Sequence, residues 1–155
     1  MVKRTQENVA YEKDRKITRL FFNETYWPKY VQRYNLVLLE KTKIYTPQQL
    51  EKIYGKYDTY ETNVLDYEKY KPSPSDSDSC MAILAENPPA GSHKLPVTCQ
   101  APKECKAGIH SGSEFGYGLS HRLLFLVLSR FARGCSVFSL KEDKYKMDKF
   151  CMRAF

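Results

Sequence analysis

The chain has 155 residues, the length of a single domain, and a net charge of +7. Lys and Arg residues alternate with Asp and Glu, and no long run of cations occurs. The charge therefore predicts a solvated basic surface rather than a nucleic-acid interface. No segment approaches the ~18–20 consecutive apolar residues of a membrane-spanning helix, so no membrane span is predicted.

The N-terminal sequence and the cysteine content point to different cellular compartments. The first residues lack the apolar region of a signal peptide, which taken literally predicts a cytosolic protein. The five cysteines instead suggest an oxidising compartment, because all lie in the second half near turn residues, as in a disulfide framework. Small buried thiols of a cytosolic protein are the alternative. The disulfide candidates are Cys80, Cys99, Cys105, Cys135 and Cys151.

An odd number of cysteines leaves one thiol free, bonded to another chain or missing its partner. The cysteines and histidines of the second half show neither the C-x2-C nor the H-x3-H spacing of structural zinc sites. We therefore predict no metal and no cofactor.

Residues 1–70 are predicted to form an N-terminal helical segment rich in tyrosine. Ile17, Leu20 and Phe21 have the i, i+3, i+4 spacing of a short amphipathic helix. A second helix is predicted over residues 30–45, and Asn23 begins a glycosylation sequon that matters only in a secreted protein. A third helix follows the capping-box pattern of residues 46–49 and is expected to end at Gly55.

Residues 71–79 are rich in Ser, Pro and Asp and are interpreted as a polar linker, followed by a cysteine-containing helical segment over residues 80–155. Asp78 is expected to cap a short helix that ends at Asn87 before two prolines. Residues 88–118 are predicted to be a long irregular connection with one helical turn at 102–106. A connection of this length needs ties, which Cys99 and Cys105 can supply.

The strongest helix signal lies at residues 119–133, which we expect to form the core helix of this segment. On a helical wheel, four polar residues fall within one arc of about 100°, a narrow cationic edge in which Leu126 is the apolar exception. A helix that is apolar over more than half of its circumference must be buried against several neighbours. Gly134 is the expected left-handed stop. The polar arc comprises Arg122, Ser129, Arg130 and Arg133, and the apolar remainder comprises Leu123, Leu124, Phe125, Val127, Leu128, Phe131 and Ala132.

A terminal helix is predicted after a second capping-box pattern at residues 139–142, and it should lie antiparallel to the core helix. Its expected apolar positions are Leu140, Tyr145, Met147, Phe150 and Cys151. Cys151 would then lie roughly 16 Å along this helix, too far from the joint for a disulfide with Cys135. Cys135 is expected instead to pair with a loop cysteine or with Cys80.

His121 is the histidine that is expected in an ordered setting, in the first turn of the core helix. The positive end of the helix dipole would favour its neutral form, which suits a general base. Ser120 is adjacent in sequence, but neighbouring helical residues point about 100° apart and do not form a Ser–His pair. Because no catalytic motif accompanies it, His121 is interpreted as structural. Tyr117 and Gly118 belong to a turn that leads into the helix.

Several short motifs of the second half resemble, in order and spacing, an uncharacterised family of animal secreted proteins that includes a thyroid-expressed vertebrate member. The matching pieces are residues 77–80, Cys99 with Cys105, residues 116–125, residues 133–135 and residues 150–151, so that the resemblance covers about residues 76–154. It implies an extracellular, disulfide-bonded, mainly helical glycoprotein that forms homodimers. It brings no catalytic residue.

Members of that family begin with a signal peptide and are about twice as long, so the chain resembles a fragment of such a protein. Some members also carry cysteines before the core helix that this chain lacks.

We therefore expect a mainly α fold, a small domain of about five or six helices with a long irregular cysteine-bearing connection. The expected function is that of a secreted protein that binds a ligand, of unknown identity, rather than catalysing a reaction. The alternatives are an enzyme whose site includes His121 and an intracellular basic binding module.

Overall fold

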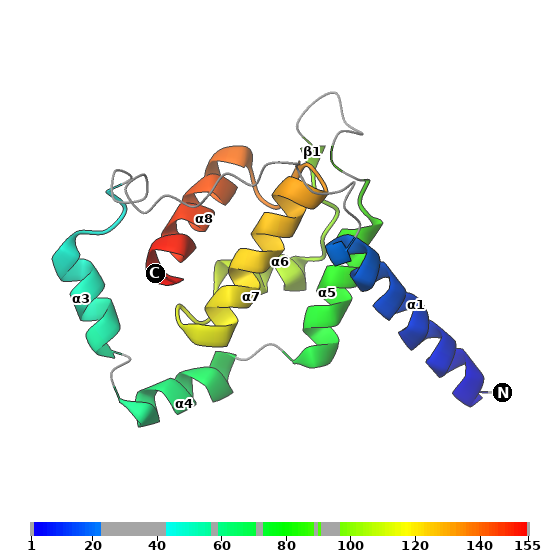
Figure 1. The fold of residues 1–155 in the computed structure, drawn as a ribbon, viewed down its shortest axis with the longest axis horizontal. Helices are drawn as coiled ribbons and strands as arrows, with labels where there is room; N and C mark the ends of the chain where they lie inside the picture. The colour runs from blue at the N-terminus through cyan, green and yellow to red at the C-terminus, as the bar shows by residue number, and fades with distance from the viewer. Residues whose placement is uncertain are drawn as a thin grey trace.

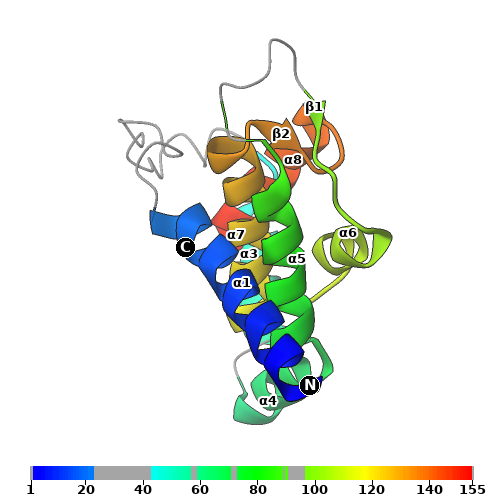
Figure 2. The same ribbon diagram turned by 90° about the vertical axis from the view of Figure 1, so that its right-hand side faces the viewer.

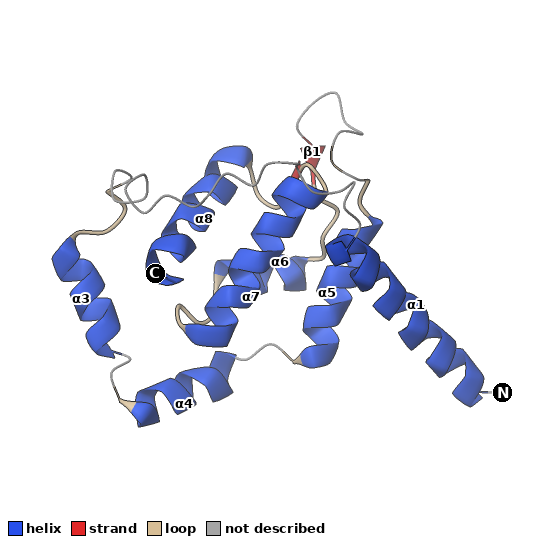
Figure 3. Ribbon diagram, in the orientation of Figure 1, coloured by secondary structure: helices blue, strands red, loops and turns tan. Residues whose placement is uncertain are grey.

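The computed structural model describes residues 2–22, 43–56, 59–70, 73–88, 90 and 97–154. These residues form a small, mainly helical domain with a two-stranded parallel ladder (Figures 1 and 3). The predicted helix over residues 30–45 lies largely outside the described residues, and so does Asn23. The helices are α1 (Val2–Phe22), α3 (Pro47–Lys56), α4 (Tyr60–Tyr70), α5 (Pro74–Glu86), α6 (Lys103–His110), α7 (Gly116–Val127), the π-helical η2 (Leu128–Ala132) and α8 (Leu140–Ala154), and the strands are β1 (Val97–Thr98) and β2 (Cys135–Ser136).

The central helix is buried as predicted. α7 and η2 place Leu126, Leu128 and Ala132 fully inside the core. α8 runs antiparallel beside them, while α5 and α6 lie on other sides of α7 (Figures 1 and 2). Gly134 follows α7 and η2 with a φ of 62°, the left-handed helix stop expected from the sequence.

The interpretation of the cationic edge was wrong. Arg122, Ser129 and Arg133 are buried together with Leu126, whereas Arg130 is exposed. The arc that looked like a polar edge is therefore largely a core-facing surface. Part of the apolar remainder reaches solvent instead, since Phe131 keeps 43% of its accessible surface.

α5 begins earlier than predicted, so the linker prediction for residues 71–79 was wrong from Pro74 onwards. Ser73 is the N-cap and accepts a hydrogen bond from the Asp76 backbone N–H at 3.1 Å, with Pro74 in the first turn. Asp78 is thus within the helix and does not cap it. The helix ends at Asn87 as expected, and the Asn87 amide donates to the carbonyl oxygens of Ile83 and Leu84.

The C-terminal half of α1 packs on α5, and the two helices diverge toward the N-terminus (Figure 1). Leu20 is fully buried, and Ile17 and Phe21 pack against the core, which confirms the predicted apolar face. Lys16 Nζ lies 2.6 Å from Glu86 Oε1 across this contact. The N-terminal helix therefore contributes to the same core as the cysteine-containing half.

Helices α3 and α4 form an arc beside the main body (Figure 1). The capping box at α3 is confirmed in both directions, since Gln49 N–H donates to Thr46 Oγ1 and Thr46 N–H donates to Gln49 Oε1. The helix passes through Gly55 and ends one residue later. Tyr54 joins it to α8 by donating to the Met152 carbonyl oxygen at 3.4 Å.

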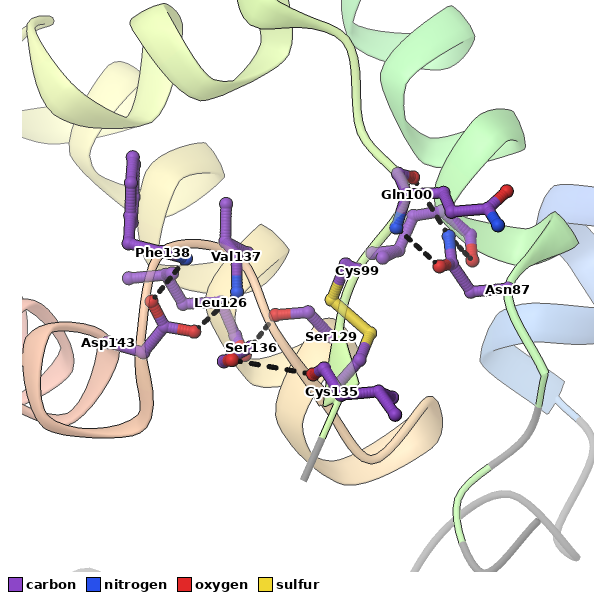
Figure 4. The surroundings of a disulfide bond; sticks show 12 residues. Asn87, Cys99, Gln100, Leu126, Ser129, Cys135, Ser136, Val137, Phe138 and Asp143 are labelled. Carbon is purple, nitrogen blue, oxygen red and sulfur yellow. Dashed lines mark hydrogen bonds between the residues drawn. A yellow bond between two sulfur atoms is a disulfide. The ribbon is translucent and has the colours of Figure 1, made fainter. Parts of the chain in front are cut away.

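The connection after residue 88 contains more structure than the single predicted turn. Its described part includes β1 and the whole of α6. β1 pairs with β2 in parallel, with Val97 opposite Cys135 and Thr98 opposite Ser136. Asn87 adds a further tie, because it accepts from the Gln100 N–H at 2.7 Å and donates to the Gln100 carbonyl oxygen at 3.0 Å (Figure 4).

The start of α8 is organised by Ser139 and Asp143. Ser139 caps it, accepting from the Glu142 N–H at 3.1 Å. The Asp143 carboxylate is buried and accepts from the Val137 and Phe138 N–H groups (Figure 4). Two of the predicted apolar positions were wrong, because Leu140 and Tyr145 are largely exposed, whereas Phe150 is buried. The helix itself was predicted correctly, but neighbouring helices cover only part of its circumference and leave Leu140 and Tyr145 in contact with solvent.

No helix in the described parts of the chain combines the length and the hydropathy needed to cross a membrane.

Candidate functional site

Two disulfides connect the cysteine-containing elements. Cys80 on α5 bonds to Cys105 on α6, and Cys99 after β1 bonds to Cys135 on β2. Cys135 was predicted to pair with a loop cysteine or with Cys80, and the loop cysteine Cys99 is its partner; Cys135 was also predicted not to bond to Cys151. Cys151 lies outside both disulfides. Because four of the five cysteines are bonded to each other, they are not available as thiolate ligands for a metal. Within the described ranges, no three His, Cys, Asp or Glu side chains gather as metal ligands.

A hollow of about 290 Å³ opens between α5, α6 and α7, and we call it the interhelix hollow. Its apolar lining includes Met81, Ile109, Phe125 and the Cys80–Cys105 disulfide. Its polar lining includes Ser77 and His121. An apolar lining with a few placed polar groups is typical of small-ligand sites. The remaining lining residues are Lys69, Gly108, Ser111, Gly112, Ser113, Gly118 and Arg122.

His121 lies in the second turn of α7, which begins at Gly116, and not in the first turn as predicted. Its Nδ1 lies 3.0 Å from Ser77 Oγ of α5. With the ring neutral and its proton on Nε2, Ser77 is the donor in this hydrogen bond. Burial lowers the pKa of His121 below its ordinary 6.5, and the negative charge of Asp78 opposes that shift. His121 is therefore neutral at physiological pH.

A chain of aromatic contacts leads from His121 away from the interhelix hollow and toward α4. The Tyr117 ring centre lies 4.1 Å from that of His121, and Tyr67 of α4 meets Tyr117 edge-on at 6.4 Å. Tyr117 and Gly118 lie in the first turn of α7, so the prediction of a turn before the helix at these residues was wrong. A smaller hollow of about 100 Å³ adjoins on the other side of Gly118, lined in part by Asp66, Tyr67, Phe115 and Tyr117.

Ser120 takes no part in this arrangement. Its hydroxyl donates to the Gly116 carbonyl oxygen one turn earlier at 3.1 Å. The prediction that Ser120 and His121 do not pair is thus confirmed. Gly134 lies beyond the far end of α7 and η2, where it sets the turn into β2 and touches no part of the hollow.

Arg122 fixes the wall of the hollow opposite α5. Its guanidinium group donates to the carbonyl oxygens of Ile109, His110, Gly112 and Ser113 at 2.7–3.3 Å, which satisfies the C-terminal end of α6. Gly112 allows this close approach, because a Cβ would lie 3.1 Å from both Arg122 Cδ and the Gly108 carbonyl oxygen, and one of these atoms would have to shift.

Sequence reasoning missed Ser77 and the role of Arg122. A signal for Ser77 was present: Ser73, Pro74 and Asp76 have the pattern of an N-cap, an N1 proline and an acidic N3 residue. A helix from Pro74 places Ser77, Cys80, Met81 and Leu84 at i, i+3, i+4 and i+7 on one face. No comparable signal exists for Arg122, since its acceptors are backbone carbonyls about ten residues away.

Comparison of the chain with protein-family models, with curated proteins and with solved structures found no match.

Proposed function

We propose that the chain is a disulfide-stabilised binding domain of an extracellular protein and that the interhelix hollow is its binding site. One observation carries the proposal: the hollow combines an apolar lining with the Ser77–His121 hydrogen-bonding pair at a solvent-open position between three helices. The two disulfides support an oxidising compartment. The resemblance of residues 76–154 to secreted proteins supports the same compartment, and it also supports a fragment of a longer, glycosylated and homodimeric protein.

The ligand that this lining favours is a small, mainly apolar molecule with one hydrogen-bonding end. Met81, Ile109 and Phe125 would cover the apolar part, because burying apolar surface is favourable by roughly 25 cal/mol per Å². His121 Nε2–H and the Ser77 oxygen would meet the polar end.

Binding can be tested with anilinonaphthalene sulfonate, a probe with an apolar ring system and one polar end. The matched variants are Gly108→Gln, which places a side chain in the hollow, and Gly55→Gln on α3, since a Cβ meets nothing within 4 Å at either glycine. We expect saturable binding near one probe per chain, weakened by Gly108→Gln and unchanged by Gly55→Gln. Equal binding by both variants would place the probe elsewhere and reject the hollow as the site.

The extracellular part of the proposal has its own test. Protein made through a secretory pathway, unfolded without reductant, should present one reactive thiol of the five cysteines. Five reactive thiols would contradict the disulfides and favour the intracellular binding module.

A serine-type hydrolase is the second candidate, favoured by the same Ser77–His121 hydrogen bond, which places a hydroxyl beside a neutral base. In the part of the chain that the structure describes, the His121 ring does not donate a hydrogen bond to a carboxylate that would orient it. For this reason binding is preferred. Covalent labelling of Ser77 by a fluorophosphonate, lost in His121→Gln, would establish the hydrolase instead.

A further inference from the structure

The two disulfides differ in their access to solvent. Cys99 and Cys135 keep 3% and 1% of their accessible surface, with Cys135 inside the β1–β2 ladder and Cys99 directly after β1. In the other pair, Cys105 keeps 7%, Cys80 is only partly buried, and both residues line the interhelix hollow. A molecule small enough to enter the hollow therefore reaches the Cys80–Cys105 bond while the fold stays intact.

The two sulfurs of the accessible bond are not equivalent. Cys80 lies in the middle of α5 and is the more exposed of the two. Cys105 lies in the first turn of α6, where the N-cap residue Pro102 provides no side-chain hydrogen bond. Backbone N–H groups of an uncapped first turn and the helix dipole stabilise a negative charge at this position. Cys105 is thus the better leaving group and Cys80 the better target.

We propose that Cys80–Cys105 is a thiol-exchange site for low-molecular-weight thiols that enter the interhelix hollow. The thiolate of the small molecule attacks Cys80 Sγ, which forms a mixed disulfide with Cys80 and breaks the Cys80–Cys105 bond. The electron pair of that bond leaves with Cys105 as a thiolate, which takes a proton from solvent. A second small thiolate then attacks the sulfur of the bound small molecule and releases Cys80 as a thiolate together with the symmetrical disulfide of the small thiol.

The fold does not depend on this bond alone. α6 remains attached through the Arg122 hydrogen bonds to the Ile109 and His110 carbonyl oxygens and through the Ile109 side chain, which is buried. Exchange would therefore change the contents of the hollow, because the group bound to Cys80 occupies it, and leave the surrounding helices in place.

The test uses the native protein with Cys151 first alkylated. Reduced glutathione is added, samples are quenched with a second alkylating reagent, and labelled peptides are identified by mass spectrometry while circular dichroism follows the helices. We expect Cys80–Cys105 to open at least roughly tenfold faster than Cys99–Cys135, without loss of helix, because the buried bond needs an unfolding step first. The glutathione adduct should be found on Cys80.

The matched variants connect this chemistry to the hollow. Gly108→Gln should slow opening of Cys80–Cys105 several-fold, and Gly55→Gln should leave its rate unchanged. The proposal is overturned if the two disulfides open together, if the adduct forms on Cys105, or if a folded Gly108→Gln protein reacts like the parent. The comparison of the two disulfides within the parent protein needs no variant and decides the question even if Gly108→Gln does not fold.

Discussion

The guanidinium carbon of Arg122 lies 4.4 Å from the centre of the Phe150 ring, which places a buried cation of α7 between α8 and the carbonyl end of α6. Burial lowers the pKa of Arg122, and the charge of Glu114 opposes that shift. The group nevertheless stays charged, because arginine is not deprotonated in proteins. One side chain of α7 thus contacts both α6 and α8.

Replacing this cation should be among the most destabilising single changes in the chain. Arg122→Met keeps much of the apolar stem but leaves four backbone carbonyl oxygens without their donor, at a cost of about 3–5 kcal/mol. Urea unfolding followed by circular dichroism measures this difference. Arg130→Met, at an exposed position of η2, is the control and should change the free energy of unfolding by less than about 0.5 kcal/mol. Similar losses for both variants would show that Arg122 does not organise the end of α6.

Gly112→Ala should destabilise the protein by about 1–3 kcal/mol, because its Cβ would press on Arg122 Cδ and on the backbone oxygen of Gly108. Gly55→Ala should instead stabilise it by about 0.5–1 kcal/mol, since it lies in α3 with open space around the added carbon. The denaturant midpoint should be lower than that of the parent for Gly112→Ala and higher for Gly55→Ala. A stable Gly112→Ala protein would mean that Arg122 can move aside without loss.

Acidification should weaken the fold through His121. Because its pKa in the folded chain lies below the ordinary 6.5, the unfolded chain binds more protons as the pH falls through that value. The free energy of unfolding therefore decreases with falling pH and becomes insensitive to this group once the pH is well above 6.5.

The comparison is made between pH 7.5 and 5 by urea unfolding. Burial raises the pKa of Glu114, but the hydrogen bond and charge of Arg153 and the charge of Lys149 outweigh it, so its net pKa is lowered and it stays ionised in this range. His121→Gln should have a smaller loss of stability on acidification than the parent. If the parent and His121→Gln lost the same stability on acidification, the pH dependence would arise from groups other than His121.

The buried Cys99–Cys135 disulfide should make a large contribution to the stability of the fold. Cys99→Ala combined with Cys135→Ala removes a link between residues 36 positions apart. Chain-entropy reasoning for a loop of this length gives a cost of about 4 kcal/mol. Thermal unfolding of the double variant under non-reducing conditions measures it. A melting temperature equal to that of the parent would show that the ladder, Asn87 and Asp143 hold this region without the bond.

Local signals in the sequence predicted much of the fold. The capping box at Thr46 and Gln49, the left-handed Gly134 and the antiparallel α7–α8 pair are each determined by residues within a few positions of one another. Distance along a helix was also sufficient to exclude a Cys135–Cys151 bond. These features depend on local geometry, which sequence spacing encodes directly.

The candidate site could not be predicted in the same way, because its parts come from separate elements. Whether Arg122 faces water or the core depends on where α6 ends, and the pairing of His121 with Ser77 depends on how α5 crosses α7. The helical wheel also assumed a regular period, which the π-helical turn at Leu128–Ala132 interrupts. The wheel could therefore identify a buried helix but not which of its polar residues were buried.

The two disulfides interleave along the chain, since Cys99 lies between Cys80 and Cys105 while Cys135 lies beyond both. Every peptide bond from Cys80 to Cys135 is therefore enclosed by at least one covalent loop. A protease that cuts once anywhere in this stretch would produce two polypeptides that still migrate as one molecule and separate only after reduction.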